Sequence, residues 1–326
     1  IKKPVHWTYN EHLILYNNAI YQLNIIPVGG SSNGSNGKSL YDIINLTSTN
    51  MGKRLLKYRI MNPITDINEL NRRYDLIDIL LKSNRIFEIE NYLNEIIDIE
   101  RLHRKISLQM LHPYEFLNLS YSYDVIHQLI AFLKDNFSFN MNKFGINEED
   151  ILKFNDYIAE YNKIFDLKEM GKYGLGNIGN SFFKLGNYED IDKVQIEINE
   201  INNFYENECK KLSNLIEPNS DFVKVESNDR EGYFLYTTIK RSEILFSKLS
   251  KDKKDKDTKD TKDTKDTKDT KENKYETKKY NGSNIKIVSS KITENSERLV
   301  TLKEEIKRIT KIEYLKTLLF LDEKYG

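Results

Sequence analysis

The chain has 326 residues and carries 50 Lys plus Arg against 50 Asp plus Glu, so its formal net charge at pH 7 is zero. This balance excludes a global attraction to nucleic acid or to an anionic membrane, and any such surface must be local. A single cysteine, Cys209, excludes an internal disulfide framework and a cysteine-based zinc site, and it suits a reducing compartment. The sequence contains no run of about eighteen apolar residues, which is the length needed to span a membrane, so no membrane partner is expected.

The first unusual stretch is GGSSNGSNGKSL, from Gly29 to Leu40, which resembles a phosphate-binding loop because it contains Gly-Lys-Ser. A P-loop also needs a glycine five positions before the glycine of that triplet, where this chain has Ser32. A Gly/Ser/Asn linker followed by a helix capped by Ser39 is therefore favoured. A nucleotide-binding enzyme built on this loop stays open as an alternative.

A helical region follows from residue 39. Apolar residues recur there at steps of three and four, which is the period of an amphipathic helix. Asp66 is expected to cap one helix, and Asn62-Pro63 ends the helix before it. The predicted helices beyond the first turn span residues 51–61, 66–81, 87–106, 114–133 and 148–165.

A glycine-rich stretch, Gly171 to Asn187, then interrupts the helical pattern. Its glycines at 174, 176 and 179 fit a dinucleotide fingerprint, but neither the preceding strand nor the following helix that the fingerprint requires is expected. A mobile loop is therefore predicted.

Two long apolar stripes predict a pair of helical arms over residues 189–217 and 291–326. The first arm would be about 40 Å long. The stripes are similar in length. The first arm would lead away from the helical region, and the second arm would lead back to it. An antiparallel, coiled-coil-like pair is therefore expected.

Between the arms the apolar period changes to two, and a small sheet is predicted. Its strands are expected at Phe222–Glu226, Gly232–Tyr236 and Ile285–Val288. The repeated triplet Asp-Thr-Lys lies in this region and has too little apolar surface to offset the entropy of ordering. Residues 250–280 are therefore predicted to be a disordered insertion.

The stretch SLYDIINLTSTNMGKRLLKYRIMNPITDINELNRRYDLIDIL, Ser39 to Leu80, resembles the start of the core or lever domain of the DNA mismatch-repair protein MutS and its homologues. The family pattern falls on Ser39-Leu40, Thr47, Thr49, Gly52, Arg54, Leu56, Pro63 and Arg72-Arg73. DIERLHRKISLQMLHPYEFLNL, Asp98 to Leu119, is similar to a second family stretch. EGYFLYTTIKRSEIL, Glu231 to Leu245, is similar to the family's clamp region.

This resemblance implies a mainly α chain: an elongated helical lever domain, two long antiparallel helical arms and a small β-sheet clamp at their tip. The implied domains are a connector end and flexible linker (1–38), a helical core (39–188), an outgoing arm (189–217), the clamp with its insertion (218–290) and a returning arm (291–326). The chain begins with Ile1, and it is expected to be part of a larger protein whose P-loop ATPase domain lies beyond Gly326.

The resemblance also implies that the clamp closes around duplex DNA, where polar and cationic side chains would meet phosphates and not bases. An ordinary solvated face is the alternative for each of these residues. The DNA-binding residues expected on the clamp loops are Lys224, Asn228, Arg230, Lys240, Arg241 and Lys248.

No catalytic residue, metal ligand or cofactor-binding residue is expected in this segment. His103 and Glu100, three residues apart on one helix, are interpreted as a local contact and not as a metal site. Arg54, Arg101 and Arg104 are expected to pair with neighbours such as Glu100 or Asp98.

By resemblance, ATP and Mg²⁺ belong to the parent protein. The expected partners are double-stranded DNA bound without sequence specificity, a second MutS-family subunit and a MutL-like protein. An intracellular location is expected: the nucleus if the source is eukaryotic, with mitochondrion or cytoplasm as alternatives. A coiled-coil scaffold that binds protein and not DNA is the alternative function.

Overall fold

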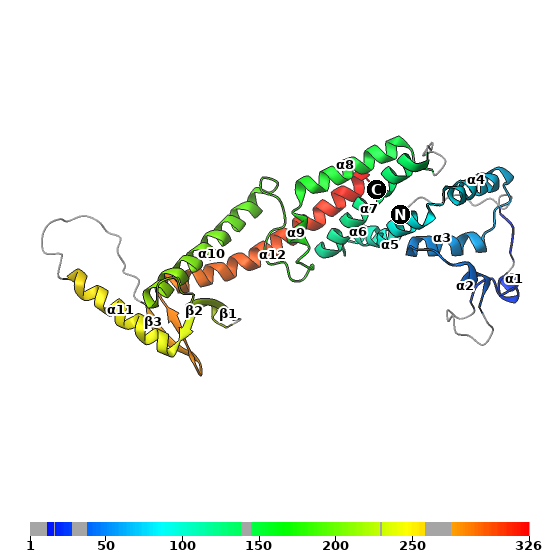
Figure 1. Ribbon diagram of the computed structural model, residues 1–326. Coiled ribbons are helices and arrows are strands. Elements are labelled where there is room, and N and C mark those ends of the chain that lie inside the picture. Colours follow the sequence, from blue (N-terminus) through cyan, green and yellow to red (C-terminus); the bar gives the residue numbers. More distant parts are fainter. Residues whose placement is uncertain are drawn as a thin grey trace. The chain divides into compact units, whose positions relative to one another are not determined.

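The computed structural model describes residues 12–15, 17–27, 38–137, 145–228, 230–257 and 275–325 (Figure 1). Most of the loop considered as a phosphate site (28–37) and most of the Asp-Thr-Lys triplets (258–274) lie outside these described residues. The chain divides into two units. The first unit is Ile1–Leu175 with Leu315–Gly326, and the second unit is Gly176–Tyr314.

The first unit is helical. Its described helices are α1 (Asn17–Gln22), α2 (Leu40–Ile44), α3 (Asn50–Met61), α4 (Ile67–Ser83), α5 (Ile86–Glu95), α6 (Ile99–Ser107), α7 (Pro113–Phe137), α8 (Glu148–Ile164) and α9 (Leu167–Met170). The last residues of α12 (Ser290–Tyr325) also belong to this unit. No helix of the described residues is long and apolar enough to cross a membrane.

The predicted helix caps at Ser39 and Asp66 are confirmed. The Ser39 hydroxyl accepts a hydrogen bond from the Asp42 amide at 3.2 Å, and the Ser39 amide donates to the Asp42 carboxylate at 3.1 Å. Asp66 accepts from the amides of Asn68 and Glu69, at 2.9 and 3.5 Å. These contacts satisfy amides that have no partner within the helix.

The single helix predicted over 87–106 is wrong, because α5 ends at Glu95 and α6 begins at Ile99. Asp98 starts α6 by accepting a hydrogen bond from the Arg101 amide at 3.2 Å. The same carboxylate receives Arg54 of α3 at 2.6 and 2.7 Å, and Arg54 also reaches Glu100 at 2.7 Å. The pairing expected for Arg54 is therefore confirmed.

Aromatic side chains of α7 and α8 form the core of the first unit. Phe116 has no exposed surface, and its ring centroid lies 5.4 Å from those of Tyr161 and Phe165. Tyr123 continues the cluster, with its centroid 5.5 Å from that of Tyr157. Edge-on aromatic packing of this kind stabilises helices beyond the area that they bury.

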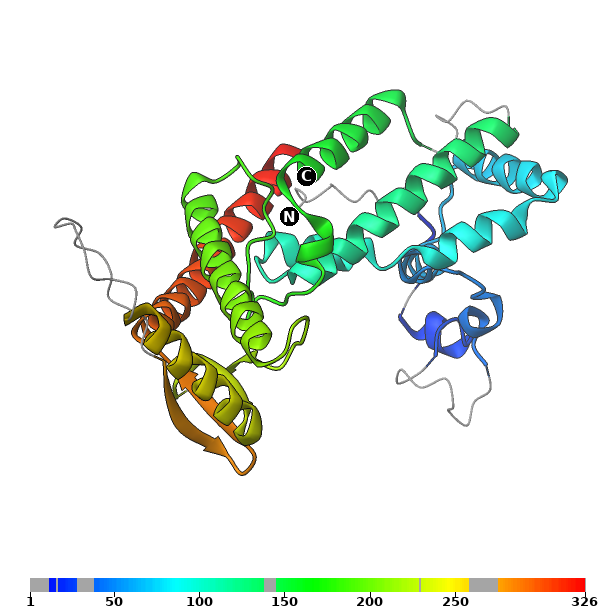
Figure 2. The ribbon, with the colours of Figure 1, turned by 60° about the vertical axis from the view of Figure 1, so that its left-hand side comes forward.

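The second unit contains a four-stranded antiparallel sheet and long helices. Its elements are α10 (Glu189–Ile216), β1 (Lys224–Asn228), β2 (Gly232–Thr238), α11 (Ile239–Asp257), β3 (Glu276–Asn281), β4 (Asn284–Val288) and the greater part of α12. The strand order is β1-β2-β4-β3. Helix α11 packs on β2 and β4 (Figure 2).

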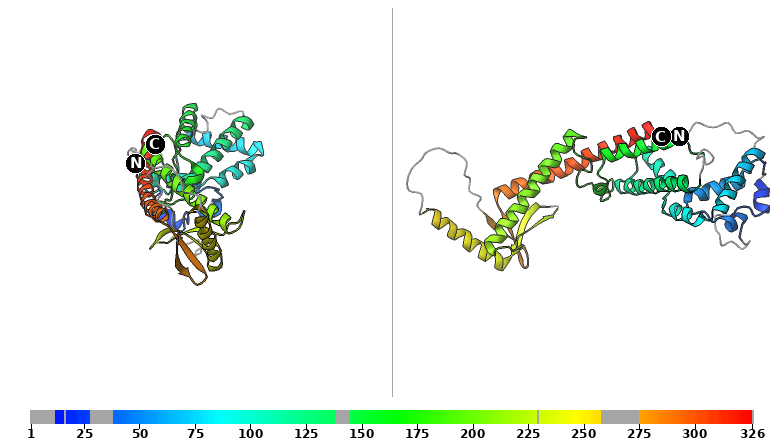
Figure 3. Two further views of the ribbon diagram at one scale, coloured as in Figure 1. Left: turned by 90° about the vertical axis from the view of Figure 1, so that its left-hand side faces the viewer. Right: turned by 45° about the horizontal axis from the view of Figure 1, so that its top comes forward.

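The two predicted long helices are confirmed as α10 and α12, and side-chain contacts show that they are antiparallel within the second unit. Tyr205 of α10 donates a hydrogen bond to the carbonyl of Ile292 at 3.0 Å. Further back along α10, Glu197 pairs with Arg298 of α12. From the first contact to the second, the residue number decreases on α10 and increases on α12, so the two helices run in opposite directions. Figure 3 shows both helices from two further directions.

The sheet and its neighbours differ from the sequence-based prediction in three places. Strand β1 runs from Lys224 to Asn228 and not from Phe222 to Glu226. Strand β3 was not predicted, and residues 276–279, which were expected to be disordered, pair with β4. Helix α11 was also not predicted, and it extends to Asp257 within the range expected to be disordered. The disorder predicted for 250–280 is therefore wrong over both of these stretches.

The glycine-rich stretch after α9 is irregular, with no strand before Gly174 among the described residues. It is anchored by apolar side chains in the second unit. Phe182 is fully buried, and its ring centroid lies 5.4 Å from that of Tyr314. The glycines therefore lack the preceding strand that a dinucleotide-binding fingerprint requires. The predicted loop is irregular, but its residue Phe182 is packed in the core of the second unit.

The turn between β1 and β2 lies against α12. Gly232 has φ of +65°, and a Cβ at this position would meet the Ser296 hydroxyl oxygen at 2.5 Å and a Val300 methyl at 3.3 Å. Its neighbour Tyr233 donates its amide to Ser296 at 2.8 Å. Only glycine combines this backbone angle with so close an approach.

The aromatic core of the first unit predicts a large effect for Phe116→Ala. Truncating this fully buried ring should lower the free energy of unfolding by about 3–5 kcal/mol, because it removes apolar burial and leaves a cavity. The measurement is urea denaturation of both chains. Phe87→Ala is the control, since Phe87 is 72% exposed, and it should change stability by no more than about 0.5 kcal/mol. Equal effects at both sites would contradict this core.

The turn geometry predicts that Gly232→Ala destabilises the second unit. The positive φ and the clash with Ser296 together should cost on the order of 1–3 kcal/mol. Gly282→Ala serves as the matched control, because Gly282 lies in the β3–β4 turn with open space around its Cα. Thermal unfolding should show a lower midpoint for the first variant alone.

Candidate functional site

Four of the six residues predicted to bind DNA are exposed on the β1–β2 hairpin or just after it. Lys224 begins β1, Asn228 ends it, Arg230 lies in the turn and Lys240 is near the start of α11. The side chain of Asn228 stabilises the turn. The Asn228 carboxamide oxygen accepts hydrogen bonds from the amides of Arg230 and Glu231, at 3.1 and 2.8 Å.

These four residues form two groups at opposite ends of the hairpin. Lys224 is opposite Tyr236, near the end of β2 from which α11 and Lys240 follow. Asn228 is opposite Gly232 at the other end, next to Arg230. Four residue steps at about 3.3 Å separate the two ends of β1, so the groups are about 13 Å apart. One extended polyanion could contact both groups, whereas a single small anion could not.

The other two predicted residues, of which Lys248 is also exposed, have structural partners within the protein. The Arg241 guanidinium lies 3.7 Å from the centroid of the Phe222 ring, an attractive arrangement for a cation. Lys248 donates a hydrogen bond to the carbonyl of Ile216 at 3.1 Å, and this carbonyl belongs to the last residue of α10. A cation at a helix C-terminus is favourable, so Lys248 supports the fold.

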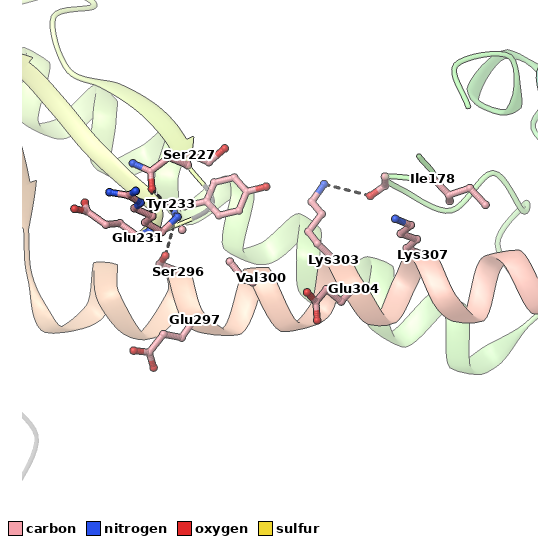
Figure 4. A pocket seen from close by; sticks show the side chains of 14 residues that line it. Ile178, Ser227, Glu231, Tyr233, Ser296, Glu297, Val300, Lys303, Glu304 and Lys307 are labelled. Carbon is pink, nitrogen blue, oxygen red and sulfur yellow. Dashed lines mark hydrogen bonds between the residues drawn. The ribbon is translucent and has the colours of Figure 1, made fainter. Parts of the chain in front are cut away.

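A pocket of about 970 Å³ lies beside the β1–β2 turn, between it, α12 and the loop at Ile178 (Figure 4). Arg230, Lys303 and Lys307 contribute cations to its wall. The acidic side chains in the wall, equal in number, are Glu231, Glu297 and Glu304. Because these formal charges cancel, the pocket does not have the net positive charge of an anion site.

Lys303 and Lys307 were not predicted from the sequence. Both project from α12 on the side of the loop at Ile178, as Figure 4 shows. Lys303 donates to the Gly179 carbonyl at 3.3 Å and to the Asn180 side chain at 3.1 Å. In the sequence they belong to the polar face of a long helix, and only the fold brings that face next to Arg230.

The described residues contain no group of three or more His, Cys, Asp or Glu side chains that could hold a metal ion. His103 lies with its Nε2 atom 2.6 Å from the Tyr123 hydroxyl, so its contact is with α7 and not with Glu100. Cys209 is buried, and burial raises the pKa of its thiol to about 12. A thiol with this pKa is protonated at neutral pH and is a poor nucleophile.

Comparison with known proteins places this arrangement in a family. The family model described as MutS domain III matches residues 18–319. A mutS homologue of Acanthamoeba polyphaga mimivirus is 38% identical over 266 residues, which cover 76% of this chain and 23% of that protein. The mitochondrial DNA mismatch repair protein mutS homologue of Sarcophyton glaucum is 30% identical over 238 residues, with coverages of 71% and 22%.

The DNA mismatch repair protein MutS of Petrotoga mobilis is 31% identical over 137 residues, which cover 42% of this chain and 16% of that protein. The chain thus spans less than a quarter of the length of these three relatives. The family match includes residues of both units, with the antiparallel helices and the sheet between them. The chain therefore belongs to the MutS family of DNA mismatch-repair proteins, and it carries the region of that family's domain III.

Proposed function

We propose that this chain is the lever-and-clamp segment of a MutS-like mismatch-repair protein and that the sheet of its second unit grips duplex DNA. The observation that carries the proposal is the exposure of cationic and polar side chains at both ends of one hairpin, about 13 Å apart. Such spacing suits successive contacts along a phosphate backbone. The contacting residues are Lys224, Asn228, Arg230 and Lys240.

The grip is expected to be independent of sequence. Lysine and arginine side chains at the surface neutralise phosphates and release counterions, whereas base reading requires side chains that enter a groove. Arg241 and Lys248, which have partners within the protein, would contribute through the local field and not through direct contacts.

The helices are proposed to relay the state of an ATPase domain to the clamp. Helix α12 has 36 residues and α10 has 28, so they are about 54 and 42 Å long. Residues of α12 belong to both units, and α12 is bonded to α10 through Tyr205 and Arg298. Helices tied together in this way are suited to move as one element.

The segment itself is proposed to be non-catalytic, with ATP and Mg²⁺ acting in the ATPase domain of the whole protein. Its proposed partners are double-stranded DNA, a second MutS-family subunit and a MutL-like protein. A reducing intracellular compartment is proposed, either the nucleus of a eukaryotic source or the mitochondrion or cytoplasm.

A second candidate is a scaffold that binds protein and not DNA. It is favoured by the helices from α2 to α5, none of which contains a buried residue. Leu46 is 87% exposed, and Ile67 and Phe87 are each 72% exposed. Large exposed apolar side chains such as these would be available to a protein partner.

The DNA proposal predicts the effect of the triple charge reversal Lys224→Glu, Arg230→Glu and Lys240→Glu. This variant should lose duplex affinity at least about tenfold at low salt, because three phosphate contacts become repulsive. The negative slope of log affinity against log salt concentration should also become shallower by about three. Fluorescence anisotropy with labelled duplexes of two unrelated sequences measures both quantities.

A control variant with the same change in net charge is Lys53→Glu, Lys82→Glu and Lys153→Glu. These three lysines are exposed in the first unit, and their reversal should leave the salt slope nearly unchanged. If both triple variants bind duplex like the unmodified chain, the DNA proposal fails. A protein partner lost on Leu46→Ser with Phe87→Ser would then favour the scaffold.

A further inference from the structure

One lysine of the sheet has an environment unlike that of its neighbours. Lys286, in the middle of β4, is only 4% exposed. Lysine is rarely buried to this degree unless its charge is paired, because desolvation of the ammonium is costly. Lys278, which lies directly opposite on β3, is exposed. Burial at this position therefore needs a specific explanation.

The surroundings of Lys286 compensate its charge. Its ammonium lies 3.6 Å from the centroid of the Phe234 ring and 4.8 Å from that of Tyr280, so aromatic rings of β2 and β3 both contact it. Its ion-pair partner is the carboxylate of Glu231. Burial lowers the pKa of Lys286, and the nearby carboxylate of Glu226 opposes this shift.

Glu231 connects this lysine to the β1–β2 turn. It is the residue after Arg230, and the amides of both residues donate to the Asn228 side chain. On the helix side, the amide of Tyr233 donates to Ser296 of α12. The turn is therefore held from two directions, by the sheet through the Lys286–Glu231 pair and by α12 through Ser296.

The two anchors act on different parts of the turn. The Ser296 bond and the close approach of Gly232 fix the start of β2. Glu231 has a side chain that is 59% exposed, whereas that of Lys286 is 5% exposed. The pair thus joins a buried cation to a largely exposed carboxylate next to Arg230. Without the cation, nothing else in the described contacts of Glu231 would hold its side chain on the sheet.

We propose that Lys286 is a positioning residue for DNA contact: it holds Glu231, and through it the turn that presents Asn228 and Arg230 to a phosphate. This inference rests on the proposed function of the hairpin. Lys286 does not itself touch the nucleic acid, because it is buried against the rings of Phe234 and Tyr280. Its contribution is to reduce the ordering that the turn would otherwise undergo on binding.

The test is a double-mutant cycle in the chain of 326 residues, with duplex affinity as the readout. Lys286→Met keeps an unbranched apolar side chain as far as Cε and removes the charged ammonium. Arg230→Gln removes the proposed phosphate contact. Each single variant should weaken binding on the order of threefold to tenfold. The double variant should bind no more weakly than the weaker single variant, because a misplaced Arg230 contributes nothing that its removal could take away.

Lys278→Met is the matched control, since it removes an exposed lysine opposite the same position, and it should change affinity less than about twofold. Circular dichroism should show the fold of Lys286→Met unchanged. Hydrogen exchange of the Arg230 and Glu231 amides should accelerate in Lys286→Met and stay unchanged in Arg230→Gln.

Two results would overturn the inference: wild-type affinity for Lys286→Met, or losses that multiply in the double variant. Multiplying losses would mean that the lysine acts only through its own charge or through general stability. Wild-type affinity for Arg230→Gln is a different result, because it would refute the DNA role proposed for this turn. The amide exchange separates the two failures, since it reports the anchoring of the turn without DNA.

Discussion

The antiparallel contact between α10 and α12 is the constraint on which the second unit depends. The hydrogen bond from Tyr205 to the carbonyl of Ile292 brings the last turns of α10 close to the first residues of α12. The chain between Ile216 and Ser290 must therefore leave and return at nearly the same place, which an antiparallel sheet achieves. The same pairing sets the side of α12 that carries Ser296 against the β1–β2 turn.

The parts of this fold that sequence patterns predicted are those that local physics determines. A repeated apolar stripe requires a helix to bury it, so α10 and α12 could be located to within a few residues. Ser39 and Asp66 could be recognised as caps because a cap acts within three residues. Strand β3 gave no such pattern, since all but one of its residues are exposed and it is ordered only by pairing with β4.

The candidate site was predictable as a set of residue types and not as a geometry. Exposed cations in a hairpin are visible in the sequence, but the partners that occupy Arg241 and Lys248 are 19 and 32 positions away along the chain, at Phe222 and Ile216. Lys286 illustrates the same limit. It stands in an alternating strand pattern like any surface lysine, and only the register of three strands encloses it between two rings.

In the strand order β1-β2-β4-β3, the edge strands are β1 and β3, and the outer backbone groups of each have no neighbouring strand among the described residues to pair with. Open edges of this kind can recruit strands from other molecules and lead to aggregation. Here both edge strands carry outward charges: Lys224 and Glu226 on β1, and Lys278 and Lys279 on β3. The fully buried apolar residues of the sheet lie on the two central strands, as Leu235 and Ile287 do. Solubility of the sheet is therefore encoded in charged side chains on both edges, of which only Lys224 is also a proposed phosphate contact, and replacing these charges with apolar residues would expose the sheet to intermolecular strand pairing.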